Sequence, residues 1–375
     1  MPLIHRPGDE AQVDFFEVMV EEAGAWVRAW LFVLRLMYSG RDFGWLYERA
    51  DQMSFLDGHV RAFEHFGAVP QRCIYDNLGA AVRRVVSPER QLTGRFQALV
   101  SHYLFEPCFT RPGTGHDKGG VEGRGKGIRW EHLTPIPRGA DLEVISSQLL
   151  AELDARAVER RDGEGRSVSE RFEEERSRML PLPGVGFRAE RVVLVEASRR
   201  ALVQVEGAWY SVPTPWHSLE VTAYVGPREV RLECRGETVN HRRQSFGKRS
   251  VRYRHYLSEL ARKPQALRQV AGELLGELGE PYGRLWRMLV DAHGPREAAR
   301  VFARVLGAVC DHGEAAVAEA IGTALAANRH DLLALAEALR TRSLSNPVPS
   351  TLAEHHIESA CAADYDRLLL GEVGR

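Results

Sequence analysis

Three acidic side chains stand at points of the sequence where they could work together on metal ions. Asp14 lies in AQVDFFEVMV, whose period-two apolar residues predict a buried strand, and it shares a face with Val18 and Val20. Asp76 ends the apolar run CIYD, and Glu122 lies in KGGVEG. Three carboxylates held close together cannot all stay ionised without a cation, and hard oxygen ligands suit Mg²⁺ or Mn²⁺.

Two such ions, roughly 3.5–4 Å apart, can activate a nucleophile and stabilise the leaving oxygen in phosphoryl transfer. This chemistry would explain a carboxylate on a buried strand face, which otherwise loses its hydration without compensation. Each acid also has a plainer interpretation. Asp76 with Asn77 can form a turn or a helix cap, and Glu122 can be an ordinary surface residue. Asp14 is the hardest of the three to explain without a partner.

The first 140 residues alternate strand and helix patterns that would position these acids. Three strand patterns come first, with turns predicted at Ala23-Gly24 and Ser39-Gly40. Helical spacing in DQMSFLDGHVRAFEHFG and GRFQALVSHYLF then separates two short strands, RCIYD and FEPCFTRP. The predicted fold class is α/β, with three antiparallel strands extended by parallel βα units and helices on both faces. If the first and fourth strands are neighbours, Asp14 and Asp76 meet at one end of the sheet.

The patterns divide the chain into four predicted regions. Residues 1–140 form the mixed-sheet core, and residues 141–188 form a helical connector. Residues 189–245 contain short strands with turn signals, which predict a small antiparallel β-barrel. Residues 246–375 begin with a basic segment and continue as an α-helical tail.

Composition excludes several other classes of protein. The chain has 375 residues, of which 44% are hydrophobic and 27% charged, and it contains no run of 18 apolar residues. Its N-terminus has no apolar signal-peptide region, and its five cysteines form no CxxC pair. We therefore expect a cytoplasmic protein without a membrane span, a zinc site or a disulfide framework.

Positive charge gathers in two places although the net charge is only −1. Residues 240–263 hold eight Lys and Arg against one acid, and Arg242, Arg243, Lys248 and Arg249 are its candidate DNA contacts. This segment can equally be a solvated tail. If the segment after Asp117 is helical, three further cations share a face with the third acid, namely Lys118, Lys126 and Arg129. They could hold DNA phosphates or only offset local negative charge.

Three stretches carry a resemblance to a known family. PGDEAQVDFFEV, VPQRCIYDNLGAAV and RPGTGHDKGGVEG occur in the order found in the catalytic core of an IstA-type insertion-sequence transposase. That family belongs to the DDE transposases and retroviral integrases, whose core is a ribonuclease H-like sheet. The segments YSVP and NHRR also resemble the small barrel of these proteins. The resemblance covers most of residues 1–255 and weakens through the helical tail.

The resemblance implies a site and a reaction. Asp14 would bridge two Mg²⁺ or Mn²⁺ ions, and Asp76 and Glu122 would each hold one. Glu122 is preferred to Asp117 because its context matches the family's Lys-Gly-x-Val-Glu. The implied chemistry is hydrolysis at the transposon's 3′ ends, followed by attack of the freed 3′-OH on target DNA. The implied partners are transposon-end and target DNA, further copies of the chain and an IstB-type ATPase.

One feature departs from the family pattern. IstA-type proteins carry a helix-turn-helix region ahead of the core, whereas here the core begins within fifteen residues of Met1. We therefore expect this chain to lack that region. Two other functions stay open beside the transposase: a non-catalytic DNA-binding or assembly protein that retains the fold, and a nuclease that hydrolyses DNA without strand transfer.

Overall fold

The computed structural model describes residues 5–75, 82–85, 90–109 and 136–327 of the chain. It divides the chain into two compact units, the first ending at Val251 and the second beginning at Arg252. The boundary therefore falls a few residues beyond the end of the predicted barrel region. Each unit is described by itself below.

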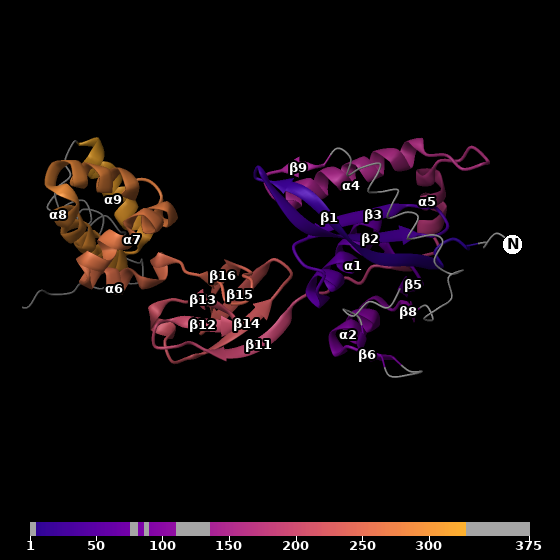
Figure 1. Ribbon diagram of the computed structural model, residues 1–375, viewed down its shortest axis with the longest axis horizontal. Helices are drawn as coiled ribbons and strands as arrows, with labels where there is room; N and C mark the ends of the chain where they lie inside the picture. The colour runs from indigo at the N-terminus through magenta and orange to yellow at the C-terminus, as the bar shows by residue number, and fades with distance from the viewer. Residues whose placement is uncertain (1–4, 76–81, 86–89, 110–135, 328–375) are drawn as a thin grey trace, which may run out of the picture. The chain divides into compact units, whose positions relative to one another are not determined.

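A six-stranded mixed sheet forms the centre of the first unit (Figure 1). Its strands are β1 (Glu10–Glu22), β2 (Ala25–Leu36), β3 (Asp42–Tyr47), β5 (Arg72–Tyr75), β8 (Glu106–Phe109) and β9 (Arg138–Gly139). The order is β3-β2-β1-β5-β8, and β9 pairs with β1. The first three strands are antiparallel, and β5 and β8 run parallel to β1. This arrangement confirms the predicted mixed sheet of a ribonuclease H-like core.

A two-residue turn at Ala23-Gly24 sets the register of the long β1–β2 hairpin. Both residues have positive φ, at 50° and 81°, as the type I′ turn requires. Glu22 pairs with Ala25 directly across this turn, and eleven further residue pairs follow along the hairpin. The predicted turn is confirmed.

Helices cover both faces of the sheet, and β2 therefore buries side chains on both of its faces. Phe32 and Leu34 belong to the apolar cluster formed with α1 (Gln52–Phe66) and α2 (Gly94–Tyr103). Leu31 and Val33 belong to a second cluster, formed with α4 (Leu142–Glu159). Figure 1 shows α1 and α4 on opposite sides of the strands. Alternate burial of this kind is typical of a sheet covered twice.

The helix α1 begins and ends where its capping residues predict. The Asp51 carboxylate accepts the Ser54 N–H at 3.0 Å, and Gly67 ends the helix with φ 68°. Its predicted inner residues Phe55 and Phe63 are fully buried. Gly58 allows the helix to approach the sheet closely, since a Cβ there would lie 2.5 Å from the Phe32 ring.

Residues 141–188, predicted to form a helical connector, contain two helices with different surroundings. The first helix, α4, packs Ile145, Leu149 and Leu153 against the sheet, so it belongs to the core. A polar segment and α5 (Val168–Arg176) follow, and α5 starts with a capping box between Ser167 and Glu170. Further on, β10 (Leu180–Pro181) pairs with β4 (Ala68–Val69). Elsewhere in the first unit, β6 (Val82–Val85) and β7 (Arg90–Leu92) form a separate hairpin.

The short strands after residue 190 form two small sheets. The first has the order β11-β14-β15-β16, with strands Arg191–Glu196, Glu220–Val225, Glu229–Cys234 and Glu237–Arg242. The second has the order β12-β13-β17, with strands Leu202–Val205, Ala208–Ser211 and Arg249–Ser250. The β13–β17 pair is parallel, and no pairing among the described strands joins the two sheets. The predicted closed antiparallel barrel is therefore not confirmed.

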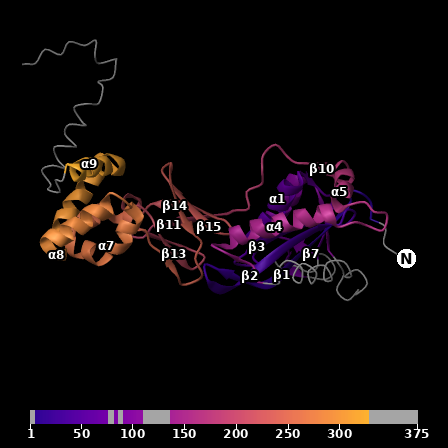
Figure 2. The ribbon, with the colours of Figure 1, turned by 90° about the horizontal axis from the view of Figure 1, so that it is seen from above.

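The second unit is helical, as the sequence predicts (Figure 2). Its elements are a 3₁₀ turn (Tyr253–Tyr256), α6 (Leu257–Arg262), α7 (Pro264–Leu278), α8 (Tyr282–His312) and α9 (Glu314–Ala326). Gly294 interrupts α8 with φ 74° and ψ 164°, and Pro295 starts the helix again. Leu274, Phe302 and Ile321 contribute to an apolar core that the helices share.

Two further predictions can be compared with the described residues. None of the helices formed by the described residues is long and apolar enough to cross a membrane. Cys73 and Cys234 are buried, Cys108 is half-buried and Cys310 is exposed, and all four thiols are free.

Candidate active site

Asp14 lies in the middle strand of the core sheet. It pairs with Val33 of β2, and residues directly opposite in an antiparallel pair project to the same face. Val33 belongs to the apolar cluster beneath α4, so Asp14 lies on the α4 face of the sheet, as Val18 and Val20 do. Its side chain is half-buried rather than fully buried, and its Oδ1 accepts the Phe15 N–H at 2.7 Å. The sheet therefore holds a carboxylate that keeps some access to solvent.

The three parallel strands meet in one row beside Asp14. Val13 of β1 pairs with Tyr75 of β5, and Tyr75 pairs with Phe109 of β8. Both β5 and β8 end at this row. The carboxyl ends of parallel strands are the usual place for ligands in sheets covered by helices. The row therefore marks the sheet edge at which a site is expected.

Most of the predicted site residues fall beyond the described residues. This holds for Asp76, Asp117 and Glu122, and for Lys118, Lys126 and Arg129. Asp76 follows Tyr75 in the chain, and Glu122 comes thirteen residues after Phe109. Within the described part of the chain, no cluster of three or more His, Cys, Asp or Glu could hold a metal ion.

A buried histidine of α1 contacts the end of β5, and the sequence analysis did not identify it. His59 of α1 is fully buried, with Nδ1 2.7 Å from the Phe55 carbonyl oxygen and Nε2 2.9 Å from the Tyr75 hydroxyl. Burial lowers the pKa of His59 to about 4, so the ring is neutral. A carbonyl only accepts, so Nδ1 donates to it and Nε2 accepts the tyrosine O–H.

This hydrogen bond fixes the last described residue of β5, which immediately precedes Asp76 in the chain. The tyrosine also lies among aromatic rings, with Phe96 and Phe109 at centroid distances of 5.6 and 5.3 Å. The available sequence signal was the histidine on the apolar face of α1, four residues after Phe55. From the sequence alone this histidine resembles an ordinary core residue, because its hydrogen-bond partner Tyr75 lies on another element.

The basic segment after residue 240 divides into exposed and buried cations. Arg243 is 9% exposed and forms ion pairs with Asp51 at 2.8 Å and with Glu206 at 2.7 Å. Its guanidinium also donates to the Gly226 carbonyl. Binding a DNA phosphate would require breaking these contacts, so the prediction of Arg243 as a DNA contact does not fit its environment.

The other three predicted cations of this segment are exposed. Arg242 pairs with Glu48 at 2.7 Å and with Glu22 at 3.6 Å, and its side chain remains 64% exposed. Lys248 and Arg249 are exposed, and neither forms an ion pair with another described residue. Arg242 would have to exchange its carboxylate partners for phosphate, whereas Lys248 and Arg249 would not.

Two protein families match separate parts of the chain. The integrase core domain matches residues 4–114, which contain the mixed sheet and Asp14. The C-terminal domain of the Mu transposase matches residues 182–254, which contain the two small sheets. Together with the mixed sheet, these matches define a ribonuclease H-like polynucleotidyl transferase.

Similarity to individual transposases extends over the whole chain. A transposase of Aminobacter aminovorans is 30% identical over 395 residues, covering 100% of this chain and 75% of that protein. A transposase for insertion sequences IS1326/IS1353 of Pseudomonas aeruginosa is also 30% identical, over 87% of this chain and 65% of its own length. The catalytic core domain of HTLV-2 integrase in complex with magnesium is 15% identical with a TM-score of 0.33, over 44% of this chain and 97% of that one.

The chain belongs to the insertion-sequence transposases that contain an integrase core domain. It is thus a DDE-type transposase, and the function of its family is DNA transposition. The predicted resemblance to insertion-sequence transposases is confirmed, and the relatives include a transposase for insertion sequence element IS21 of Pseudomonas aeruginosa, 28% identical over 56% of this chain and 54% of that protein. The chain spans three quarters of the Aminobacter relative and just under two thirds of the IS1326/IS1353 relative.

Proposed function

We propose that this chain cleaves transposon 3′ ends and transfers them to target DNA, using Asp14, Asp76 and Glu122 to hold two Mg²⁺ or Mn²⁺ ions. The observation that carries the proposal is the half-buried Asp14 carboxylate, one residue beyond the pair formed by Val13 and Tyr75. Asp76 directly follows Tyr75 in the chain, which supports its part in the proposal. Glu122 enters the proposal through its Lys-Gly-Gly-Val-Glu context.

The described part of the site fits a hard divalent cation. Asp14 offers carboxylate oxygens of the type that Mg²⁺ and Mn²⁺ prefer. Its setting is half-buried, and one of its oxygens already accepts a backbone N–H. Bound ions would activate the attacking oxygen and stabilise the leaving oxygen. The protein's own contribution is to fix the carboxylates, with Tyr75 and His59 acting as positioning residues for the end of β5.

The proposed reaction exchanges phosphodiester bonds in two steps. Water first attacks the phosphorus at the transposon end, and the P–O3′ bond breaks to leave a free 3′-OH. That hydroxyl then attacks a target phosphorus and displaces the target strand's 3′ oxygen. Each step forms one P–O bond and breaks another, so no oxidant or reductant takes part.

We further propose which cations hold the DNA backbone. Lys118, Lys126 and Arg129 are proposed beside the third acid, and Arg242, Lys248 and Arg249 on the small sheets. Exposure of the latter three supports their part of the proposal. Phosphate contacts of this kind would fix the register of the DNA without reading its sequence. We also propose that the chain acts as a homo-oligomer, with an IstB-type ATPase as partner, in the bacterial cytoplasm.

The deciding experiment compares Asp14→Asn with a matched variant of the same strand. Glu17→Gln also neutralises an acid of β1, but Glu17 is exposed and lies three residues further on. Each protein is incubated in Mn²⁺ with supercoiled plasmid and a labelled duplex carrying an end of the encoding element. We expect Asp14→Asn to lose cleavage and joining by at least about 100-fold while its DNA affinity stays unchanged. Glu17→Gln should keep both activities.

The products separate the three candidate functions. Label joined to plasmid supports the transposase, whereas nicked plasmid without joined label indicates a nuclease. DNA binding with neither product indicates a non-catalytic binding or assembly protein. Full activity in Asp14→Asn would show that the proposed acid does not hold the metal.

A further inference from the structure

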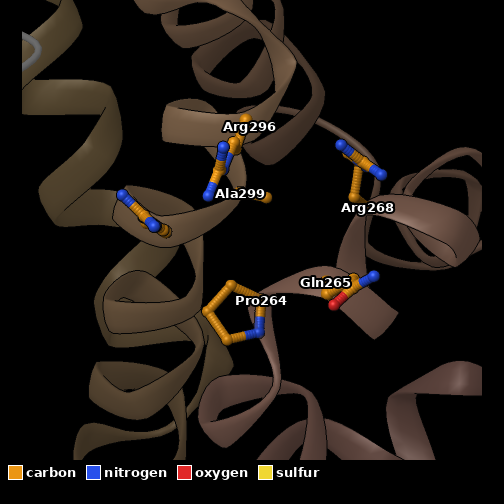
Figure 3. Close-up of a pocket in the computed structure, with 6 residues that line it drawn as sticks. Pro264, Gln265, Arg268, Arg296 and Ala299 are labelled. Carbon is orange, nitrogen blue, oxygen red and sulfur yellow. The ribbon is translucent and has the colours of Figure 1, made fainter.

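The helical unit carries an arginine-lined cavity of about 450 Å³. It lies between α7 and α8, and Figure 3 shows the side chains that surround it. Its lining residues are Pro264, Gln265 and Arg268 from α7, and Arg296, Ala299 and Arg300 from α8. Half of these residues are arginines, and the chemistry proposed for the first unit uses none of them.

The positive charge in this cavity is largely uncompensated. All three arginine side chains belong to exposed residues. Arg300 pairs with Glu297 one turn earlier, at 2.6 Å. For Arg268 and Arg296, no ion pair is formed with any residue in the described ranges. The cavity is thus lined by three arginines, of which one is paired with a carboxylate, and their positive charge attracts an anion.

Two helix starts add to this positive potential. The helix α7 begins at Pro264, where no side chain caps it. The second half of α8 begins at Pro295, directly after the break at Gly294. The first turns of both segments include lining residues of the cavity, and the N–H groups of a first turn have no partner within the helix. These dipoles supplement the arginines in the same place.

We propose that this cavity binds a backbone phosphate of DNA. Guanidinium groups bind phosphate oxygens in a bidentate fashion, and three arginines from two helices line this cavity. The described lining residues include no aromatic side chain on which a base could stack, so we take the contact to be with the backbone and independent of sequence. The proposal rests on the proposed function, because it takes the transposase's DNA as the ligand.

The test measures DNA affinity of the full chain in EDTA, where cleavage does not take place. The triple variant Arg268→Ala, Arg296→Ala, Arg300→Ala is compared with a control that removes three other exposed arginines of the same unit. That control is Arg262→Ala, Arg284→Ala, Arg287→Ala, none of which lines the cavity. Affinity for a labelled 30-base-pair duplex is followed by fluorescence anisotropy between 50 and 300 mM NaCl.

We expect the cavity variant to bind at least about tenfold more weakly, with a salt dependence reduced by about one to two units. The control should lose markedly less. Glu297→Gln should bind DNA more tightly than the wild type, because it frees Arg300 and removes the nearby negative charge. An equal loss in both triple variants would overturn the proposal, since only total charge would then matter.

A second readout identifies the source of the phosphate. Inorganic pyrophosphate is titrated against the wild type and the cavity variant, and thermal stabilisation is measured. Stabilisation that depends on the cavity, with unchanged DNA affinity, would assign the site to a free polyphosphate and reject DNA. Because no step needs catalysis, failure of the Asp14→Asn cleavage test would leave these binding results interpretable.

Discussion

The buried His59 makes the stability of the first unit depend on pH in a predictable direction. Burial lowers the pKa of His59 from the ordinary value of 6.5 to about 4, so the ring stays neutral in the folded protein. In the unfolded chain the ring takes up a proton as the pH falls through 6.5. Between these two values the unfolded state binds more protons, so the free energy of unfolding decreases as the pH falls. At neutral pH and above, this contribution is fully present.

The two pKa values set the size of the effect. Linkage gives a loss of about 2 kcal/mol in the free energy of unfolding between pH 7.5 and pH 5. The loss approaches about 3 kcal/mol below pH 4, where both states carry the proton. Protonation would also remove the acceptor at Nε2, so the hydrogen bond from the Tyr75 hydroxyl would be lost with it.

Other groups titrate over the same range, so the assay compares variants. His59→Gln keeps a donor and an acceptor but has no titratable ring, and His217→Gln removes an exposed histidine as the control. Urea unfolding is followed at pH 7.5 and pH 5 by tryptophan fluorescence, since six of the seven tryptophans precede Arg252. His59→Gln should lose about 2 kcal/mol less than the wild type or the control over this range. Equal losses in all three proteins would refute the neutral buried imidazole.

Two further predictions concern packing and charge in the same unit. Gly58→Ala should lower the free energy of unfolding by about 1–3 kcal/mol, because its Cβ would overlap the Phe32 ring. The control Gly94→Ala meets no neighbouring atom and should change the free energy of unfolding little. Urea unfolding compares the two variants, and an equal effect would contradict the close approach of α1 to the sheet. Arg243→Ala should cost about 2 kcal/mol because it breaks ion pairs with the partly exposed Asp51 and Glu206, and exposed Arg242→Ala at most about 1 kcal/mol. Thermal unfolding tests this pair, and similar melting temperatures would contradict the buried ion pairs.

Local sequence signals were enough to predict most elements of the core. The period-two pattern from residue 11 and the positive-φ turn at Ala23-Gly24 determine the β1–β2 hairpin within one continuous segment. Asp51 and Gly67 likewise cap α1 through contacts made within a few residues. These features depend on neighbours in the chain, so a single sequence reveals them.

Other features were out of reach of the sequence because they depend on residues far apart in the chain. Nothing in LEVISSQLLAELDARAVE distinguishes a connector from a helix that covers a sheet, and only its contacts with Leu31 and Leu46 show the second role. The short strands after residue 190 carry the turns of a barrel, but closure depends on which edges pair. The same limit applied to Arg243, since its partners lie at positions 51 and 206.

For the candidate site, the sequence by itself determined the residue types: the acid Asp14 on a strand, two further acids in recognisable contexts, and a family to which they belong. The tertiary structure decided that β5 lies beside the strand that carries Asp14, and that His59 contacts the end of β5. The pairing of Val13 with Tyr75 joins positions 62 residues apart, and the His59 hydrogen bond crosses from helix to sheet. Burial, pKa and ion pairing depend on the three-dimensional surroundings of a side chain, and a linear pattern specifies these only after the chain has folded.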